Sequence, residues 1–421
     1  MSRKVVVIGQ GYVGLPIAMR AVEVGYDVIG LDNDATRVAR LVAADSFVED
    51  VSSDEVAAAL ASGRFMASTD PSVAVGFDVA VITVPTPLRE SVPDLSYIET
   101  AARSLAPYVR AGALVVLEST TYPGTTEELM LPILEDGSGL KGGVDFFAGY
   151  SPERIDPGNP VWTFVSTPKV VSGIDAASLV EVEAFYGSLV DRVVPVSTCR
   201  AAELTKLLEN TFRHVNIALV NELAVFAQQL DIDVWEAIDA ASSKPFGFMK
   251  FTPGPGVGGH CLPIDPSYLS WRVRQSLGRQ FRFVELANDV NDHMPDYVVT
   301  RLTLALNERS KPVRGSSILL LGLTYKKNSS DARESPAVKV AELLLELGAE
   351  LEVVDPHLSE SPRSLRDLAV GAKPSREIAD YDAVVLLTDH DAFDFIGIAE
   401  SATLVLDTRH RMPATPAVEY L

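Results

Sequence analysis

One of the two cysteines in the sequence, Cys261, lies in a loop that is dense in glycine and proline. The loop reads PGPGVGGHCLPIDP from Pro253 to Pro266. Its glycines let the backbone come close to a ligand, and the next acidic side chain is Asp265. A thiolate in such a loop can act as a nucleophile, whereas an isolated cysteine is more often an inert core residue. From the residues alone, both interpretations of Cys261 stay open. Cys199 has neither a glycine loop nor a paired acid, so we expect it to be structural.

Lys206 and Asn210 are four residues apart in a segment with helical periodicity, so we expect them on one face of a helix. An ammonium group can hold an oxyanion or a water molecule, and an amide can orient it. The alternative is an ordinary solvated helix face. We expect Glu203 and Glu209, which flank the pair, to be surface charges.

Two further candidates follow predicted strands. Glu153, in the SPER segment 151–154, can act as a base or carry a water molecule. Thr120, in the EST segment 118–120, follows another strand, at the edge where ligands of open α/β sheets bind. Either side chain could instead cap the helix that follows it.

The segment GQGYVG, from Gly9 to Gly14, follows a predicted strand and begins a predicted helix. In that context the first glycine makes a turn, the second lets a pyrophosphate approach the backbone, and the third lets the helix pack on the strand. Asp32 ends the second strand, 21 positions after Gly11, where a carboxylate binds both ribose hydroxyls and repels a 2'-phosphate. The sequence therefore predicts an NAD site, since an ordinary tight turn would leave Asp32 unexplained. Arg37 is either a solvated helix cation or a contact to the adenosine end of the cofactor.

Apolar runs rich in β-branched residues alternate with helical patterns up to about residue 200, which is typical of a doubly wound parallel sheet. The predicted strands are 5–8, 27–31, 79–84 and 114–118. From 201 to 230, apolar residues recur every three or four positions without Gly or Pro, which predicts one long helix. Further helices are predicted at 234–241, 268–277 and 295–307.

A second βαβ series is predicted after this helical region, with a helix at 337–347 and strands at 317–323, 350–354, 383–387 and 403–406. The expected fold class is therefore α/β, with two Rossmann-like doubly wound domains joined by a central all-helical domain that contains the long helix. The expected domains are 1–199, 200–305 and 306–421.

The chain has 421 residues and a net charge of −21. A field of that sign repels phosphate backbones and anionic lipids, so we expect neither nucleic acid nor a membrane as partner. An anionic small molecule can bind only where local cations and backbone NH groups overcome the repulsion. Two cysteines make no disulfide framework, and no run approaches the roughly 18 apolar residues that span a bilayer. We expect a cytoplasmic protein without a metal site.

Several segments, taken in order, resemble those of the UDP-glucose/GDP-mannose dehydrogenase family along the whole chain. The matching segments are GxGYVGLP (9–16), PTP (85–87), EST (118–120), SPER (151–154), Lys206-x3-Asn210, GGHC-x3-D (258–265) and YKK-x3-D-x-RESP (325–336).

The resemblance implies an NAD-dependent, four-electron oxidation of C6 of a nucleotide sugar. Cys261 would form a thiohemiacetal and then a thioester that water hydrolyses. Lys206, together with Asn210, would stabilise successive oxyanions, while Asp265 and Glu153 manage protons or water. The residues implied to contact NAD are Gly9, Gly11, Tyr12, Val13, Gly14, Asp32, Arg37, Thr86, Thr120 and Arg333.

The resemblance also assigns substrate-binding residues in the second Rossmann-like half. Tyr325, Lys326 and Arg409 would hold the diphosphate and the nucleoside, and Gly258 would line the sugar site with Lys206 and Asn210. Enzymes of this family are similar in pairing through the central helical domain, which implies a homodimer.

The sugar is indicated by departures from the UDP-glucose branch of the family, which usually reads Pro-Glu-Phe-Leu where this chain has Arg154 and Ile155 after Glu153. These residues, and Arg213, resemble the UDP-N-acetylglucosamine and UDP-N-acetylmannosamine branch. A UDP- or dTDP-glucose substrate is the alternative. Two other classes are a two-electron hydroxyacid dehydrogenase, which would have no use for Cys261, and an NAD-sensing binding protein, against which the intact catalytic set argues.

Overall fold

The computed structural model describes residues 3–89, 92–155, 159, 161–259, 262, 264–358 and 360–421. The predicted nucleophile Cys261 and its neighbour His260 therefore lie outside the described residues. The chain divides into two compact units, Met1–Glu209 with Ser267–Gly278 and Asn210–Pro266 with Arg279–Leu421. Each unit has a sheet of its own.

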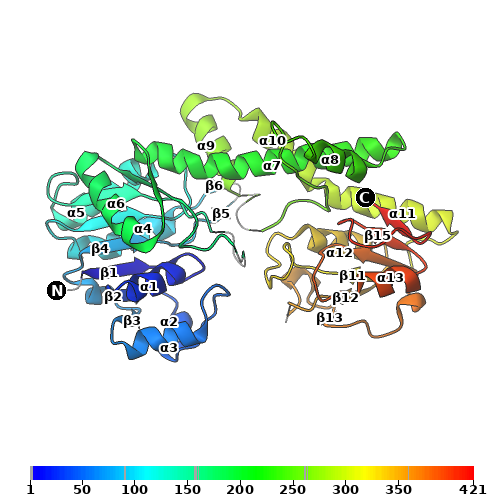
Figure 1. Ribbon diagram of the computed structural model, residues 1–421, viewed down its shortest axis with the longest axis horizontal. Coiled ribbons are helices and arrows are strands. Elements are labelled where there is room, and N and C mark those ends of the chain that lie inside the picture. Colours follow the sequence, from blue (N-terminus) through cyan, green and yellow to red (C-terminus); the bar gives the residue numbers. More distant parts are fainter. Residues whose placement is uncertain are drawn as a thin grey trace. The chain divides into compact units, whose positions relative to one another are not determined.

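The sheet of the first unit has the strand order β10-β9-β8-β7-β4-β1-β2-β3 (Figure 1). Its neighbouring strands are parallel, except that β8 and β9 are antiparallel. The strands are β1 Lys4–Ile8, β2 Asp27–Leu31, β3 Phe65–Ser68, β4 Val79–Ile82, β7 Leu114–Leu117, β8 Phe147–Tyr150, β9 Lys169–Gly173 and β10 Val193–Pro195. The helices are α1 Gly14–Glu23, α2 Ala35–Val42, α3 Ser53–Ala61, α4 Ser96–Leu105, α5 Leu131–Ser138 and α6 Ala176–Leu189, and a short hairpin joins β5 Leu88–Arg89 to β6 Val92–Pro93.

Helices cover both faces of this sheet because the strand side chains alternate. Val6 and Ile8 of β1 belong to a core shared with α4 and α5, whereas Val5 and Val7 belong to a core shared with α1, α3 and α6. Strands that are buried on both faces explain the continuous apolar runs in the sequence. The prediction of a doubly wound domain is confirmed.

The strand order reverses at β1, which lies between β2 and β4. The loops that follow β1 and β4 are in contact at this reversal, since the Thr83 hydroxyl donates to the Gly9 carbonyl at 2.8 Å. The Gly9 amide also donates to the Leu31 carbonyl at the end of β2, at 2.7 Å. Ligands of open α/β sheets bind at such a reversal, beyond the carboxyl ends of the strands. The first unit therefore presents its binding edge where the glycine motif lies.

A single long helix, α7 Cys199–Gln229, confirms the helix predicted at 201–230. Its first residues belong to the first unit, and its residues from Asn210 onward belong to the second. The remaining helices of this region are α8 Val234–Ser242, α9 Asp265–Leu277, α10 Arg282–Asp292 and α11 Met294–Glu308. The sequence analysis missed α10, whose buried side chains are few.

The second unit contains a parallel sheet of order β13-β12-β11-β14-β15-β16. Its elements confirm the second predicted βαβ series. The sequence did not predict β13, β16 and α13, which are too short to show periodicity. The elements are β11 Ser317–Leu321, α12 Pro336–Glu346, β12 Glu350–Val354, β13 Val370–Gly371, β14 Ala383–Leu386, α13 Phe395–Ser401, β15 Val405–Asp407 and β16 Val418–Tyr420. Over the described residues, none of the helices has the length and apolar content needed to cross a membrane.

Candidate active site

The glycine motif forms a backbone cradle in the first unit. Gly9 has a φ of +95°, a conformation that favours glycine. A Cβ on Gly14 would lie 1.8 Å from the Gly9 carbonyl oxygen, so only glycine lets α1 begin this close to β1. A Cβ on Gly11 would meet no heavy atom within 4 Å, which leaves one side of the turn open. Tyr12 is exposed and Val13 half-buried beside that open side. The cradle fits the pyrophosphate of a dinucleotide.

Asp32 is held at the end of β2 by two backbone amides. Its Oδ2 accepts from the Gln10 amide at 2.8 Å, and its Oδ1 accepts from the Asp34 amide at 2.9 Å. Each carboxylate oxygen has a second lone pair, so Asp32 can still accept from ribose hydroxyls. Arg37 lies 3.7 Å from Asp32 and 3.6 Å from Asp34, with its guanidinium over the Phe47 ring. Arg37 is thus a paired cation beside the predicted adenosine end, not a freely solvated one.

Thr86 and Thr120 are joined across the ends of β4 and β7. The Thr86 hydroxyl donates to the Thr120 carbonyl at 2.8 Å, and the Tyr268 hydroxyl donates to the Thr86 carbonyl. Thr86 is buried and Thr120 half-buried. The side chain of Thr86 is therefore committed to holding the loop that carries Thr120.

Glu153 follows β8, and both of its carboxylate oxygens have partners. Its Oε1 accepts from the amides of Arg154, at 2.6 Å, and of Ile155. Its Oε2 lies 3.2 Å from the Lys169 ammonium. Burial by itself would raise the pKa of Glu153, but the charges of Lys169 and Lys206 and the hydrogen bonds lower that pKa overall. Glu153 is therefore an anion near neutral pH, with Lys206 close enough to act on it.

The side chain of Lys206 is buried, and this excludes the solvated helix face for that residue. The expectation that Glu203 is a surface charge is wrong. Glu203 is fully buried and accepts from the amides of Gly124, at 2.6 Å, and Thr126, at 2.9 Å. Burial raises the pKa of Glu203 to about 7 although these donors lower it. Its face of α7 packs on the loop after β7, a tertiary contact that helical periodicity does not reveal.

Glu209, by contrast, is partly exposed, and its carboxylate lies 2.7 Å from the Arg154 guanidinium. Arg154 also donates to the Pro168 carbonyl at 2.6 Å. The contact with Glu209 fixes the predicted substrate residue Arg154 against α7, and the amide of the next residue, Ile155, donates to Glu153. Cys199 is fully buried, and burial raises the pKa of its thiol to about 12, in accordance with a structural role.

In the second unit, Asn210 and Asp265 are bonded to each other. The Asn210 Nδ2 donates to the Asp265 Oδ2 at 2.5 Å, and Asp265 is buried at the start of α9. The amide of Asn210 is thus oriented by a carboxylate. Arg213, by contrast, is exposed on α7.

The glycine loop is anchored by residues that the sequence analysis missed. The Gly254 amide donates to Asn221 Oδ1 at 3.0 Å, and Asn221 Nδ2 donates to Asn291 Oδ1 at 2.9 Å. Both asparagines are buried. An asparagine on the core face of a predicted helix is the only signal that could have shown this anchor.

The same loop packs on the predicted nucleotide-binding residues of this unit. A Cβ on Gly258 would lie 2.7 Å from Tyr325, and one on Gly254 would lie 2.8 Å from the Arg409 guanidinium. Arg409 donates to the Leu387 carbonyl at 2.7 Å. The structure therefore brings together Gly258, Tyr325 and Arg409. Lys326 is half-buried in the same segment as Tyr325.

Arg333 lies nearby in sequence and makes a two-pronged contact to Asp331, with distances of 2.9 and 2.6 Å. Its guanidinium is more than half exposed. Within the described part of the chain, no group of three or more His, Cys, Asp or Glu residues could hold a metal ion.

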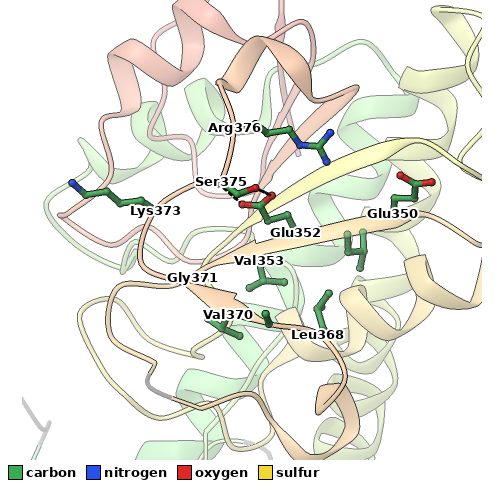
Figure 2. Close-up of a pocket in the computed structure, with 11 residues that line it drawn as sticks. Glu350, Glu352, Val353, Leu368, Val370, Gly371, Lys373, Ser375 and Arg376 are labelled. Atoms are coloured by element: carbon green, nitrogen blue, oxygen red, sulfur yellow. Dashed lines mark hydrogen bonds between the residues drawn. The ribbon is translucent and has the colours of Figure 1, made fainter.

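A groove of about 510 Å³ lies over β12 and the segment 368–376. Figure 2 shows Ser375 hydrogen-bonded to Glu352 in this groove, while Lys373 points away from both. Of the predicted site residues that the structure describes, none lines it. The groove therefore has no part in the chemistry considered below.

Three domains of one known protein family match successive parts of the chain. Residues 3–190 match the NAD binding domain of the UDP-glucose/GDP-mannose dehydrogenase family, residues 200–293 its central domain and residues 319–413 its UDP binding domain. UDP-N-acetyl-D-mannosamine dehydrogenase of Pyrococcus horikoshii is 34% identical, over 98% of this chain and 97% of that protein. The chain belongs to the UDP-glucose/GDP-mannose dehydrogenase family. It is an oxidoreductase with an NAD-binding domain, which confirms the predicted class and cofactor.

Other members of the family are similar in sequence or structure. UDP-N-acetyl-D-glucosamine 6-dehydrogenase of Pseudomonas aeruginosa is 37% identical, over 94% of this chain and 92% of that protein. The structure of the Pyrococcus horikoshii enzyme has a TM-score of 0.89 at 33% identity and covers 99% of this chain and 98% of its own. A UDP-glucose dehydrogenase structure from Pyrobaculum islandicum has a TM-score of 0.87 at 29% identity and covers 100% of this chain and 98% of its own. Fold similarity alone therefore does not distinguish the sugars.

Replacing Asp32 with alanine is expected to lower the preference for NAD over NADP at least about tenfold, because the carboxylate that binds the ribose hydroxyls and repels a 2'-phosphate is lost. The measurement is the ratio of the two dissociation constants by calorimetry. Asp34→Ala is the matched control, since Asp34 lies two residues away and caps α2. An unchanged ratio in Asp32→Ala would contradict the assignment.

Replacing Asn221 with alanine is expected to lower the free energy of unfolding by about 1–3 kcal/mol, because the Gly254 amide loses its buried acceptor. Urea unfolding measures the change. Asn216→Ala is the control on the same helix, since Asn216 is half-buried and donates only to the Phe212 carbonyl of its own helix. Equal losses in the two variants would show that Asn221 is no special anchor.

Proposed function

We propose that this enzyme oxidises C6 of a UDP-N-acetylhexosamine to the uronic acid in two NAD-dependent steps. The proposal rests above all on one observation: the catalytic set Glu153, Lys206, Asn210, Cys261 and Asp265 occurs in order in a chain that matches such dehydrogenases over nearly its whole length. The geometry of the described members supports it. Glu153 is an oriented anion near a buried ammonium, and Asn210 is oriented by Asp265.

NAD, when bound at the Gly9–Gly14 cradle with its ribose on Asp32, supplies the hydride acceptor. In the first step the C6 hydroxyl loses a proton and a hydride and becomes an aldehyde. Lys206 and Asn210 lie one helical turn apart and stabilise the negative charge that develops on the oxygen. Thr120, held by Thr86, lies at the edge of the sheet where the reacting oxygen is bound.

The Cys261 thiolate then adds to the aldehyde carbon and forms a thiohemiacetal. Loss of a second hydride gives a thioester, and water hydrolyses it to the carboxylate and the free thiol. Each oxyanion in this sequence needs the same cation, which Lys206 provides. Glu153 takes a proton from the attacking water because it is ionised near neutral pH. Asp265, which is hydrogen-bonded to Asn210, also takes part in proton transfer.

The anionic substrate is bound by local cations in a chain whose net charge is −21. Tyr325, Lys326 and Arg409 hold the diphosphate and nucleoside, and Gly258, which packs on Tyr325, lines the sugar site. Arg154, which is paired with Glu209 of α7, and Ile155 line the sugar site with Arg213. Arg333 contacts the cofactor.

A second candidate is a UDP- or dTDP-glucose 6-dehydrogenase with the same mechanism. It is favoured by the similarity of the fold to the Pyrobaculum islandicum UDP-glucose dehydrogenase. The UDP-N-acetylhexosamine is preferred because the relatives reported above that are most similar in sequence are named for such sugars.

The proposal predicts that two NADH are formed for each sugar consumed. The purified enzyme is incubated with NAD and a panel of UDP-N-acetylglucosamine, UDP-N-acetylmannosamine, UDP-glucose and dTDP-glucose, and NADH is measured by absorbance and sugar by chromatography. A ratio of one would indicate a simple alcohol dehydrogenase, and no NADH with any sugar would favour an NAD-binding sensor.

Cys261→Ser is expected to abolish the formation of uronic acid, with turnover reduced at least about 10³-fold, because a thioester can no longer form. Cys199→Ala is the matched control, since Cys199 is the only other cysteine and is fully buried. Turnover near the wild-type rate in Cys261→Ser would overturn the covalent mechanism.

We also propose that the enzyme is a homodimer whose subunits pair through the apolar face of α7. Four apolar side chains of this face, and Leu230 directly after the helix, are each at least 46% exposed; the four are Phe212, Leu219, Leu223 and Phe226. Their spacing follows one stripe of the helix, and a stripe of this length is an interaction surface in a protein of ordinary composition. The occupant is a second copy of the chain, in keeping with the resemblance.

Leu223→Glu is expected to halve the mass measured by sedimentation at micromolar concentration, from twice 45.3 kDa to 45.3 kDa. A charge on an apolar interface is strongly unfavourable unless it finds a partner. Leu345→Glu, an exposed leucine of α12, is the control. A wild-type monomer would contradict the proposal.

A further inference from the structure

Four ionisable side chains form a buried cluster behind the proposed water-activating residue. Lys169, the first residue of β9, contacts Glu118 at the end of β7 and lies 3.2 Å from Glu153. The Tyr186 hydroxyl, from α6, donates to the other oxygen of Glu118. Glu118, Lys169 and Tyr186 are at most 3% exposed. Two carboxylates thus share one ammonium in the interior of the first unit.

Such a cluster is expensive to bury, and a fold gains little from it compared with apolar residues of similar volume. The arrangement of the cluster around Glu153 indicates a functional role. Glu153 is the least buried member, at 8% exposed, and follows the carboxyl end of β8; its Oε1 is already held by two backbone amides. Lys169 holds the remaining oxygen, so the carboxylate cannot rotate. The Lys169 ammonium itself is fixed by Glu118 and lies over the rings of Phe164 and Tyr186.

We infer that Lys169 is a positioning residue for Glu153, and that Glu118 and Tyr186 hold Lys169 in place. Lys169 fixes the direction of the Glu153 carboxylate and keeps it ionised for the activation of water. This inference rests on the role given to Glu153 in the proposed function.

The charges around Glu153 agree with that role. Burial raises the pKa of Glu118 to about 8, with Lys169 acting against the rise and Glu153 adding to it. The pKa of Glu153 is lowered, as described above. Below about pH 8 the cluster therefore contains one anion, Glu153, and one cation, Lys169. The other cation that acts on Glu153 is Lys206, while Arg154 is paired with Glu209.

The first test is Lys169→Met, which removes the ammonium and keeps the length of the side chain. Without the cation the pKa of Glu153 rises, so the acidic limb of the kcat–pH profile moves to higher pH. We expect kcat near neutral pH to fall about 10–100-fold with the KM for NAD unchanged. A profile of wild-type shape would overturn the inference.

Lys169→Met also leaves Glu118 buried without its cation, so lower stability could explain lower activity. The double variant Glu118→Gln, Lys169→Met also replaces the Glu118 carboxyl, so that no buried acid is left there without its partner, and its Tm is expected to recover toward the wild-type value. Its kcat–pH profile is expected to stay displaced, because Glu153 still lacks Lys169. If profile and Tm recover together, the cluster is only structural.

Lys4→Met is the matched control for removal of an ammonium in the same sheet. Lys4 donates to the carbonyls of Val73 and Val75 at 2.8 and 2.7 Å and has no predicted part in catalysis. We expect its kcat–pH profile to match that of the wild type. A similar displacement in Lys4→Met would show that the shift is not specific to Lys169.

A readout that needs no substrate separates this inference from the proposed function. Infrared titration of the folded protein is expected to show a buried carboxylic acid that ionises around pH 8 and is missing in Glu118→Gln. In the double variant, a carboxylic acid from Glu153 should persist to higher pH than in Glu118→Gln alone. If no nucleotide sugar is oxidised but the carboxylic acid bands of Glu118 and Glu153 show the expected pH dependence, the proposed function fails and the control of Glu153 by Lys169 stands. If sugars are oxidised and neither band is seen, the inference fails alone.

Discussion

The rise of the α-helix sets the distance between the two groups on which the proposed oxidation depends. Lys206 and Asn210 are four residues apart on α7, so they are separated by about 6 Å along its axis and lie on nearly the same face. Because α7 is continuous from Cys199 to Gln229, this separation is fixed by backbone hydrogen bonds and not by a loop. Lys206 is counted with the first compact unit and Asn210 with the second.

The contacts around α7 hold the reactive groups on each unit. In the first unit, Glu203 binds the loop after β7, and Glu209 binds Arg154 next to Glu153. In the second, Asn210 binds Asp265, and Asn221 binds the start of the glycine loop. A helix that would otherwise need only apolar burial is thus bonded through polar groups to the loop after β7, to Arg154, to Asp265 and to the glycine loop. Buried polar groups of this kind specify one arrangement when they are fully satisfied.

Local sequence predicted the parts of the molecule that are determined locally. The turn at Gly9, the carboxylate at Asp32 and the length of α7 follow from spacing and periodicity, and the structure agrees with each. Contacts between distant residues were not predictable in this way. Helical position alone predicts a surface charge at Glu203, because it gives no information on the loop at Gly124 that covers this side chain.

The cluster behind Glu153 was missed for the same reason. Lys169 and Glu118 are 51 residues apart and come from strands that are neighbours only through β8, so their pairing depends on the strand order of the sheet. The resemblance to a family supplied most roles in the candidate site. It could not supply the reason why a carboxylate stays ionised in a buried position, which is electrostatic and requires coordinates.

The burial of Cys199 also makes the chain convenient for chemical labelling. Its thiol is inaccessible and keeps its proton far above neutral pH, so alkylating reagents do not find a thiolate there. Since the chain has only two cysteines, any thiol modified in the folded protein is Cys261. A spectroscopic probe can therefore be attached to a single known sulfur without prior removal of another.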